Sequence, residues 1–337
     1  MFPLLIAHAV AQEAPPIVNG YETSGMPAVG ALVAKKGNNG GSICSATLVK
    51  INWVITAAHC VTAAEEYEAE GWTIHFVVAS DIYGAWDDSS TISRMVIHPD
   101  YSYDSNGIDY DIAAMKLTDN IKTVGLMRLN TDQVLSSWKG QDLTYVGFGI
   151  TDTGKTDAGI KRAVVLPLVE YDGQFVYTID EGSPLKNICS GDSGGAALMK
   201  REQDDKWELV GVNSFVWNND GSSTIDCGAA GTGAAASRID RNVDFLSGLF
   251  TVEEEVHEGD SDTDSDSDTD TDSDADGDTD SDSDTDVGDS GVTDSGLDGT
   301  PTGDKGGGTG VCSPVGAPAW LGLFGLVALA RRRPRKP

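Results

Sequence analysis

The sequence feature that most restricts the fold is a glycine-rich stretch around one serine, Cys189-Ser190-Gly191-Asp192-Ser193-Gly194-Gly195. Glycines on both sides of Asp192 and Ser193 let the backbone turn sharply, so that the amides of Gly191 and Ser193 point at one place. Two such amides form an oxyanion hole, which a nucleophilic serine needs together with a base and a group that orients the base. A plain surface turn is the alternative, and other parts of the chain decide between the two.

A histidine and an aspartate stand where such a serine would need them. An apolar, strand-like run ends in His59, and Cys60 follows at once. A cysteine can fix the loop here, which favours a functional imidazole over a structural one. Asp111 comes directly before a second apolar run, and Asp109 competes with it for the same role. We therefore predict that His59 is a general base and that Asp111 orients it.

The three stretches resemble the chymotrypsin/trypsin-like serine peptidases, whose chains carry His, Asp and Ser in this order within TAAHC, DIAxxKL and GDSGG signatures. The resemblance implies a catalytic triad of His59, Asp111 and Ser193, with an oxyanion hole formed by the Gly191 and Ser193 amides. It implies an endopeptidase that cleaves protein or peptide substrates through an acyl-enzyme and needs no cofactor or metal. A catalytically weak binding or surface-stalk protein on the same fold is the alternative, although no triad member is missing.

Segments outside the triad carry the likeness over residues 17–250. Ile17-Val18-Asn19-Gly20 resembles the mature N-terminus of the family, whose freed amine pairs with the aspartate before the nucleophile, here Asp192. Residues 212–216 resemble the segment that pairs with the substrate backbone. Phe148 and Phe215 stand where the family usually has tryptophan.

The resemblance also implies a set of substrate-binding residues, namely Asn187, Ser214, Phe215, Val216 and Gly233. Asn187 takes the floor of the primary specificity pocket, where trypsin-like enzymes have aspartate. Val216 and Gly233 match wall positions that are usually glycine. A neutral floor and a narrowed entrance predict weak selectivity for small or medium uncharged side chains. Asp226 would restore a preference for Lys or Arg if it pointed inward.

Short apolar runs separated by Gly, Asn, Asp and Ser predict an all-β fold with antiparallel barrels or sandwiches. The resemblance narrows this to two packed antiparallel β-barrels with a short C-terminal helix, expected at 240–250. The runs are 31–34, 53–57, 72–78, 143–146, 162–168 and 209–212.

Five cysteines in an exported chain suggest bridges with one cysteine left over. The resemblance pairs Cys44 with Cys60, around the histidine loop, and Cys189 with Cys227, between the nucleophile loop and the pocket wall. Cys312 is the odd one.

The first 16 residues have the features of a processed leader. Residues 1–11 are apolar and end in an Ala-x-Ala site, which predicts a secretory signal peptide rather than a buried strand. Residues 12–16 would then be a short propeptide of a zymogen. Because Pro16 stands where family zymogens carry Arg or Lys, we expect a different activating peptidase or stepwise trimming.

Composition changes abruptly near residue 252. From Asp260 to Asp286 aspartate occupies every second position, so residues 251–310 are expected to form an acidic, disordered linker, with a calcium-responsive spacer as the alternative. The net charge of the chain is −30, and residues 17–250 alone carry about −13. Such charge argues against nucleic acid as a partner.

The end of the chain, residues 311–337, combines Cys312 with an apolar stretch at 315–330 and an arginine-rich terminus. This arrangement resembles the MYXO-CTERM class of C-terminal sorting tags. It implies an apolar C-terminal helix that contacts the membrane, export and sorting machinery as partners, and processing at Cys312, with a plain membrane anchor as the alternative. The expected location is the cell surface, the outer envelope or the extracellular space.

Overall fold

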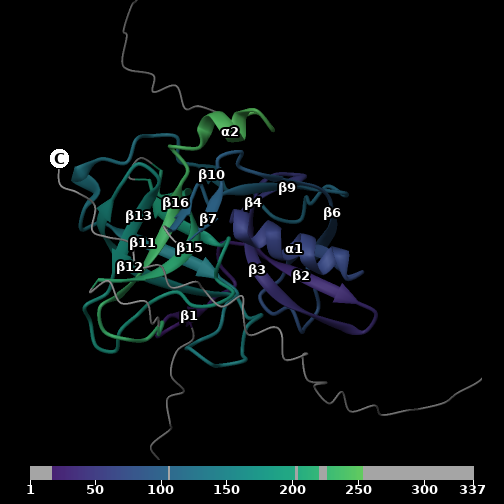
Figure 1. Cartoon of the computed structure of the whole chain (residues 1–337), viewed down its shortest axis with the longest axis horizontal. Helices are drawn as coiled ribbons and strands as arrows, with labels where there is room; N and C mark the ends of the chain where they lie inside the picture. Colours follow the sequence, from purple (N-terminus) through teal and green to yellow (C-terminus); the bar gives the residue numbers. More distant parts are fainter. Residues whose placement is uncertain (1–16, 105–106, 202–203, 220–225, 253–337) are drawn as a thin grey trace, which may run out of the picture. The chain divides into compact units, whose positions relative to one another are not determined.

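The computed structural model describes residues 17–104, 107–201, 204–219 and 226–252, shown in colour in Figure 1. The predicted signal peptide and propeptide, the C-terminal segment and all but the first two residues of the acidic linker lie outside the described residues. Within the described ranges, no helix is long and apolar enough to span a bilayer.

Strands dominate the described chain. They are β1 (Tyr21–Glu22), β2 (Val29–Lys36), β3 (Asn39–Lys50), β4 (Trp53–Thr56), β5 (Thr73–Val78), β6 (Asp88–Ile97), β7 (Ser102–Asp104), β8 (Gly107–Asp109), β9 (Ala113–Leu117), β10 (Arg128–Leu129), β11 (Asp142–Gly147), β12 (Arg162–Tyr171), β13 (Phe175–Ile179), β14 (Ala196–Lys200), β15 (Trp207–Asn218) and β16 (Thr232–Arg238). The helices are α1 (Ala58–Ala69), the 3-10 turn η1 (Ser136–Trp138) and α2 (Val243–Ser247).

The first barrel is closed and antiparallel, in the order β2-β3-β4-β9-β6-β5. Its inward side chains, among them Leu48, Ile55 and Phe76, are fully buried. Gly30 permits close strand packing, because a Cβ there would lie 2.5 Å from the Val77 carbonyl oxygen. The apolar runs predicted as strands at 31–34, 53–57 and 72–78 fall on β2, β4 and β5.

The second barrel follows the order β12-β11-β14-β15-β16-β13 and closes through pairing of β12 with β13. β1 adds to β12, and β10 pairs in parallel with β15. Its core includes Leu143, Tyr145, Val164 and Val210, all essentially buried. The predicted all-β fold of two antiparallel barrels is therefore confirmed, and the predicted C-terminal helix is present but shorter than 240–250, as α2.

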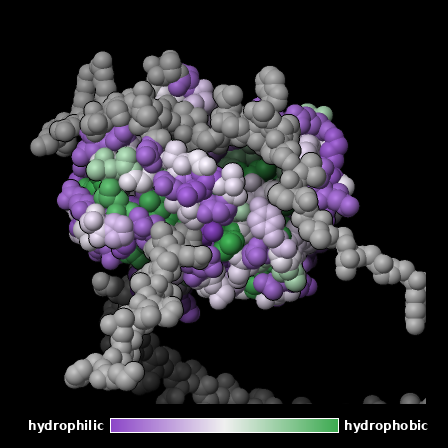
Figure 2. Space-filling view, turned by 90° about the horizontal axis from the view of Figure 1, so that it is seen from below, coloured by the Kyte–Doolittle hydropathy of each residue, from purple (hydrophilic) through white to green (hydrophobic). Residues whose placement is uncertain are grey.

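One apolar cluster joins the two barrels. Leu48 and Ile55 of the first barrel share it with Leu198 and Val212 of the second. On the face seen in Figure 2, hydrophobic residues form only small areas between hydrophilic ones, as expected when apolar side chains gather inside the barrels. The candidate functional residues lie at this junction.

Candidate active site

His59 and Asp111 are brought together by strand pairing. His59 follows β4 in the first turn of α1, and Asp111 precedes β9, whose Ala113 pairs with Thr56 at the end of β4. His59 Nδ1 lies 2.8 Å from Asp111 Oδ2, and the His59 backbone amide donates to Oδ1 at 3.0 Å. The second bond fixes the carboxylate plane, so the imidazole has a defined orientation.

The second barrel completes the surroundings of Asp111, which is fully buried. The Ser214 hydroxyl of β15 donates to Oδ2, the same oxygen that faces His59. The Ser237 hydroxyl of β16 donates to the Asp111 backbone oxygen at 2.7 Å. Sequence reasoning assigned Ser214 to substrate binding and missed Ser237, because a serine within an alanine-rich strand carries no local signal.

These contacts set the proton affinity of the histidine. Burial alone would lower the pKa of His59, but the charge of Asp111 and its hydrogen bond outweigh burial and raise the pKa above 6.5. Asp109, the competing carboxylate, instead accepts a hydrogen bond from Gln174 at 3.2 Å. The arrangement therefore provides a base strengthened by one specific carboxylate.

The Ser193 loop is a tight turn before β14. Gly191 and Gly194 have φ angles of +95° and +77°, which L side chains rarely adopt. A Cβ on Gly191 would lie 2.9 Å from the Gly149 Cα, so glycine is needed there for space as well as for conformation. Ser193 itself is 6% exposed.

The first barrel holds this loop in place. The Ser45 amide of β3 donates to the Ser193 carbonyl at 2.8 Å. The Ser45 hydroxyl donates to the Gly191 carbonyl at 2.9 Å and accepts from the Phe148 amide at 3.0 Å. Ser45 thus binds the peptide before Asp192 and the peptide after Ser193. It directly follows Cys44, and sequence reasoning overlooked it.

The Asp192 side chain is fully buried and lies against Gly147 at the end of β11. Its two carboxylate oxygens each accept a backbone hydrogen bond of 2.8 Å, from Gly149 and from Cys189. Burial raises the pKa of Asp192 to about 7, although these bonds and the charge of Arg162 favour the carboxylate. Ile17 is fully buried in the same apolar cluster as Cys189, and in this chain it is joined to Pro16.

Comparison with known proteins agrees with this geometry. Residues 17–233 match the trypsin family. The chain belongs to the trypsin family of serine endopeptidases. It is 27% identical over 251 residues to the CLIP domain-containing serine protease B4 of Anopheles gambiae, a match that covers 64% of this chain and 65% of that protein.

Two vertebrate members are similar at the same level. Trypsin-1 of Salmo salar is 28% identical over 214 residues, covering 60% of this chain and 83% of the trypsin. Chymotrypsin-like elastase family member 1 of Homo sapiens is 26% identical over 219 residues, covering 59% and 81%. The chain thus spans just under two thirds of the mosquito protease and about four fifths of the other two.

The five residues predicted to bind substrate are all buried. Asn187 is buried, and its Nδ2 donates to Thr232 Oγ1 at 3.2 Å. Val216 is also buried and pairs across the sheet with Ala234, whereas Gly233 pairs with Trp217. A Cβ on Gly233 would lie 2.1 Å from the Thr178 carbonyl oxygen. The residue opposite Val216 in the sheet is therefore Ala234, and Gly233 lies one position before it in β16.

The structure also gives the surroundings of Phe215 and Asp226, the other residues that the sequence analysis considered for specificity. Phe215 is buried with its ring centroid 5.2 Å from that of Phe175. Asp226 is exposed and accepts a hydrogen bond from the Gly228 amide at 3.2 Å.

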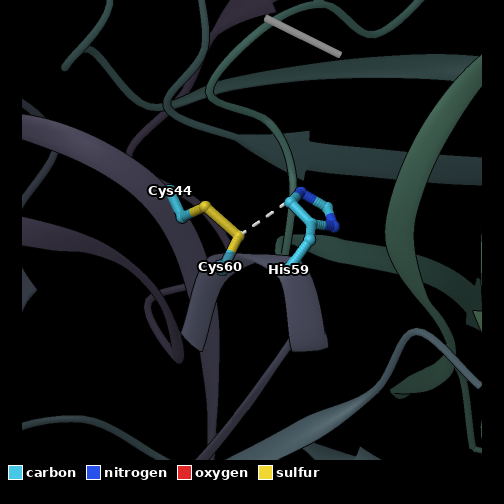
Figure 3. Close-up of side chains that lie close together, drawn as sticks. All are labelled: Cys44, His59 and Cys60. Carbon is cyan, nitrogen blue, oxygen red and sulfur yellow. Dashed lines mark hydrogen bonds between the residues drawn. A yellow bond between two sulfur atoms is a disulfide. The ribbon is translucent and has the colours of Figure 1, made fainter. Parts of the chain in front are cut away.

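Both expected disulfides are present, Cys44–Cys60 and Cys189–Cys227. Figure 3 shows the His59 ring beside the first of them, with Nε2 3.7 Å from the Cys60 sulfur. These three side chains are of metal-ligand type and lie within 4.8 Å of one another. Because both sulfurs belong to the disulfide, they are not thiolates, and the cluster serves to anchor the histidine loop.

Proposed function

We propose that this chain is an exported serine endopeptidase in which Ser193 is the nucleophile. The Ser193 Oγ attacks the scissile carbonyl carbon while His59 Nε2 takes its proton. His59 then gives that proton to the leaving amine. In the second half of the reaction His59 takes a proton from water, the water oxygen attacks the acyl carbon, and Ser193 leaves with the proton that His59 returns. Asp111 holds the imidazole tautomer, and the Gly191 and Ser193 amides stabilise the oxyanion.

The observation that carries this proposal is the His59–Asp111 pair at the barrel junction. Its buried carboxylate faces Nδ1 at 2.8 Å, which leaves Nε2 for the reacting proton. The Ser193 loop is bonded to Ser45, which also accepts a hydrogen bond from the Thr56 hydroxyl, three residues before His59. Ser45 therefore contacts both the loop of the proposed nucleophile and the strand that leads to the proposed base.

The primary specificity we propose is a weak selectivity for small or medium uncharged side chains. Asn187 would provide a neutral floor, and Val216, which stands at a wall position where the family usually has glycine, would narrow the entrance. A preference for Lys or Arg would need an inward carboxylate, and Asp226 is exposed.

Activation, in this proposal, requires cleavage between Pro16 and Ile17. The freed amine of Ile17 would pair with Asp192, whose buried carboxylate has two amide donors and a pKa of about 7. An amine there would favour the ionised carboxylate. Pro16 means that a peptidase of other than trypsin-like specificity makes the cut.

The remaining assignments concern export. The domain plan we propose is a signal peptide (1–11), a propeptide (12–16), the protease domain (17–250), an acidic linker (251–310) and a C-terminal sorting segment (311–337). Two disulfides fit an exported protein. The likeness of Cys312 and the segment after it to the MYXO-CTERM class supports delivery to the cell surface or release from it.

Substitutions in the mature protein test the mechanism. Ser193→Ala and His59→Ala should each reduce kcat on peptide substrates by about a thousandfold or more, because triad members act as a unit. Asp111→Asn should also lose most activity, while its matched control Asp109→Asn should keep it. Near-normal turnover by His59→Ala would refute the proposed mechanism. A parent protein that hydrolyses no peptide would favour the alternative, a binding protein on a protease fold.

A further inference from the structure

Arg162 is a buried cation behind the oxyanion loop. It begins β12, opposite Gly147 of β11 and Glu22 of β1, and only 2% of it is exposed. Its Nη1 donates to two backbone oxygens, those of Gly149 and Asp157, each at 2.9 Å. Its Nε is buried without a hydrogen-bond partner among the described residues. Burial of a charged guanidinium carries a large desolvation free energy, so a role of Arg162 beyond packing is expected.

Gly149 connects this arginine to the site. Its carbonyl accepts from Arg162, while its amide donates to Asp192 Oδ1 at 2.8 Å. The fit is tight, because a Cβ on Gly149 would lie 2.6 Å from the Asp192 Cγ and 2.7 Å from the Ser190 oxygen. The Gly149 Cα in turn lies against Gly191. A shift of Gly149 would therefore move both Asp192 and the amide of Gly191.

A second contact closes the loop that contains Gly149. Thr151 donates to the Asp157 carboxylate through its amide at 3.0 Å and through its hydroxyl at 2.6 Å. Since Arg162 binds the backbone at both Gly149 and Asp157, it holds the two ends of this nine-residue segment together. Ile150 adds a bond to the Ser190 oxygen at 2.8 Å. The segment is thus fixed to the nucleophile loop on one side and to Arg162 on the other.

We propose that Arg162 is a positioning residue for the oxyanion hole, acting through Gly149 on Asp192 and Gly191. Its positive charge also favours ionised Asp192, so one side chain holds both the backbone and the carboxylate behind Ser193. The proposal rests on the proposed function, since it assigns a role in forming the site that Ser193 uses.

The role of Arg162 is tested by steady-state kinetics on protein that has been cut before Ile17. The variants compared are Arg162→Gln, Arg162→Lys and Arg238→Gln. Arg238 is the matched control, a buried arginine of the same barrel that pairs with Asp240 and binds the Asp172 carbonyl. A misplaced oxyanion donor affects the transition state more than substrate binding. Arg162→Gln should therefore lower kcat by about tenfold or more with KM nearly unchanged, and Arg162→Lys should lose less. Arg238→Gln should lower Tm while keeping kcat below its melting temperature.

Thr151→Val provides a milder test that does not depend on folding of an arginine variant, because it removes only the hydroxyl bond to Asp157. It should lower kcat by a few fold without changing KM. Unchanged kcat in Thr151→Val, or in a folded Arg162→Gln protein, would overturn the inference, as would an equal loss of kcat in Arg238→Gln. If the unsubstituted protein does not hydrolyse peptides, or Ser193→Ala does so equally well, the proposed function itself fails. An active parent with an inactive Ser193→Ala and fully active Arg162 variants refutes only the role of Arg162.

Discussion

Gly194 lies so close to Thr56 that a Cβ on the glycine would come within 2.1 Å of the threonine Oγ1. Gly194 follows the proposed nucleophile, and Thr56 ends the strand that leads to His59. The two barrels therefore meet in direct contact next to the proposed catalytic side chains. A Cβ would also lie 2.3 Å from the Ser45 carbonyl oxygen, which is backbone and cannot move aside cheaply.

Gly194→Ala should consequently destabilise the fold by roughly 3 kcal/mol or more, as overpacking and an unfavourable φ combine. Gly154→Ala is the matched control, because its φ of +82° is similar but no atom lies within 4 Å of the added Cβ. The control should lose only about 1 kcal/mol. Urea unfolding of both variants measures the difference, and equal losses would show that the close contact with Thr56 does not exist.

The pH dependence of His59 provides a second prediction. Its pKa is raised above 6.5, and the base must be neutral, so kcat/KM should rise with pH through an ionisation above 6.5. The His59–Asp111 pair should also add stability that is fully present below pH 6.5 and is lost as the pH rises through the folded pKa. NMR titration of His59 in Ser193→Ala protein checks the first point directly.

Asp111→Asn supplies the control for that titration. It removes the charge that raises the pKa of His59 and leaves burial, which lowers it. The His59 pKa should then fall below 6.5. A His59 pKa that does not change on this substitution would mean that Asp111 is not its electrostatic partner.

The pocket floor yields a third prediction. Asn187 is buried and bonded to Thr232, and in the proposed pocket it forms the floor. Asn187→Asp would then place a carboxylate where the substrate side chain enters. This variant should gain cleavage after Lys and Arg, measured with a peptide library, while the parent prefers small or medium uncharged residues. Asp226→Asn should leave the cleavage specificity of the parent and of Asn187→Asp unchanged, because Asp226 is exposed. A parent that already cleaves mainly after Lys or Arg would refute the pocket assignment.

The disulfides yield a fourth prediction. They span 16 residues for Cys44–Cys60 and 38 residues for Cys189–Cys227. In the chain-entropy account, their removal costs about 3 and about 4 kcal/mol respectively. Replacement of each pair by serine, followed by calorimetric unfolding, should show the larger loss for the longer loop. The opposite order would mean that local contacts near His59 outweigh chain entropy.

Most of the fold was predictable because the relevant signals are local. Apolar runs at 53–57 and 143–146 coincide with β4 and β11, and almost every residue of these two strands is buried, which a continuous apolar run indicates. Helix α1 was missed, although its Ala- and Glu-rich sequence has high helix propensity. Its buried face consists mainly of alanines, which give little hydrophobic periodicity.

In the candidate site, too, residues within local motifs were predictable and residues that act through distant contacts were not. His59, Asp111 and Ser193 stand in recognisable motifs, and the structure brings the first two into contact. Ser45 and Arg162 could not be found in this way, because their roles depend on backbone groups about a hundred and about thirteen residues distant in the chain. The register that places Ala234 opposite Val216 depends on an irregularity in β15 between Asn213 and Phe215, which no sequence pattern specifies.

Fluorophosphonate labelling of the secreted protein, followed by peptide mapping, tests the central claim most directly. A serine that is activated by His59 reacts with this probe, whereas an ordinary surface serine does not. The account predicts one label, on the peptide that contains Ser193, and loss of that label in both Ser193→Ala and His59→Ala. An unlabelled parent, or a label that persists in His59→Ala at the parent rate, would contradict it.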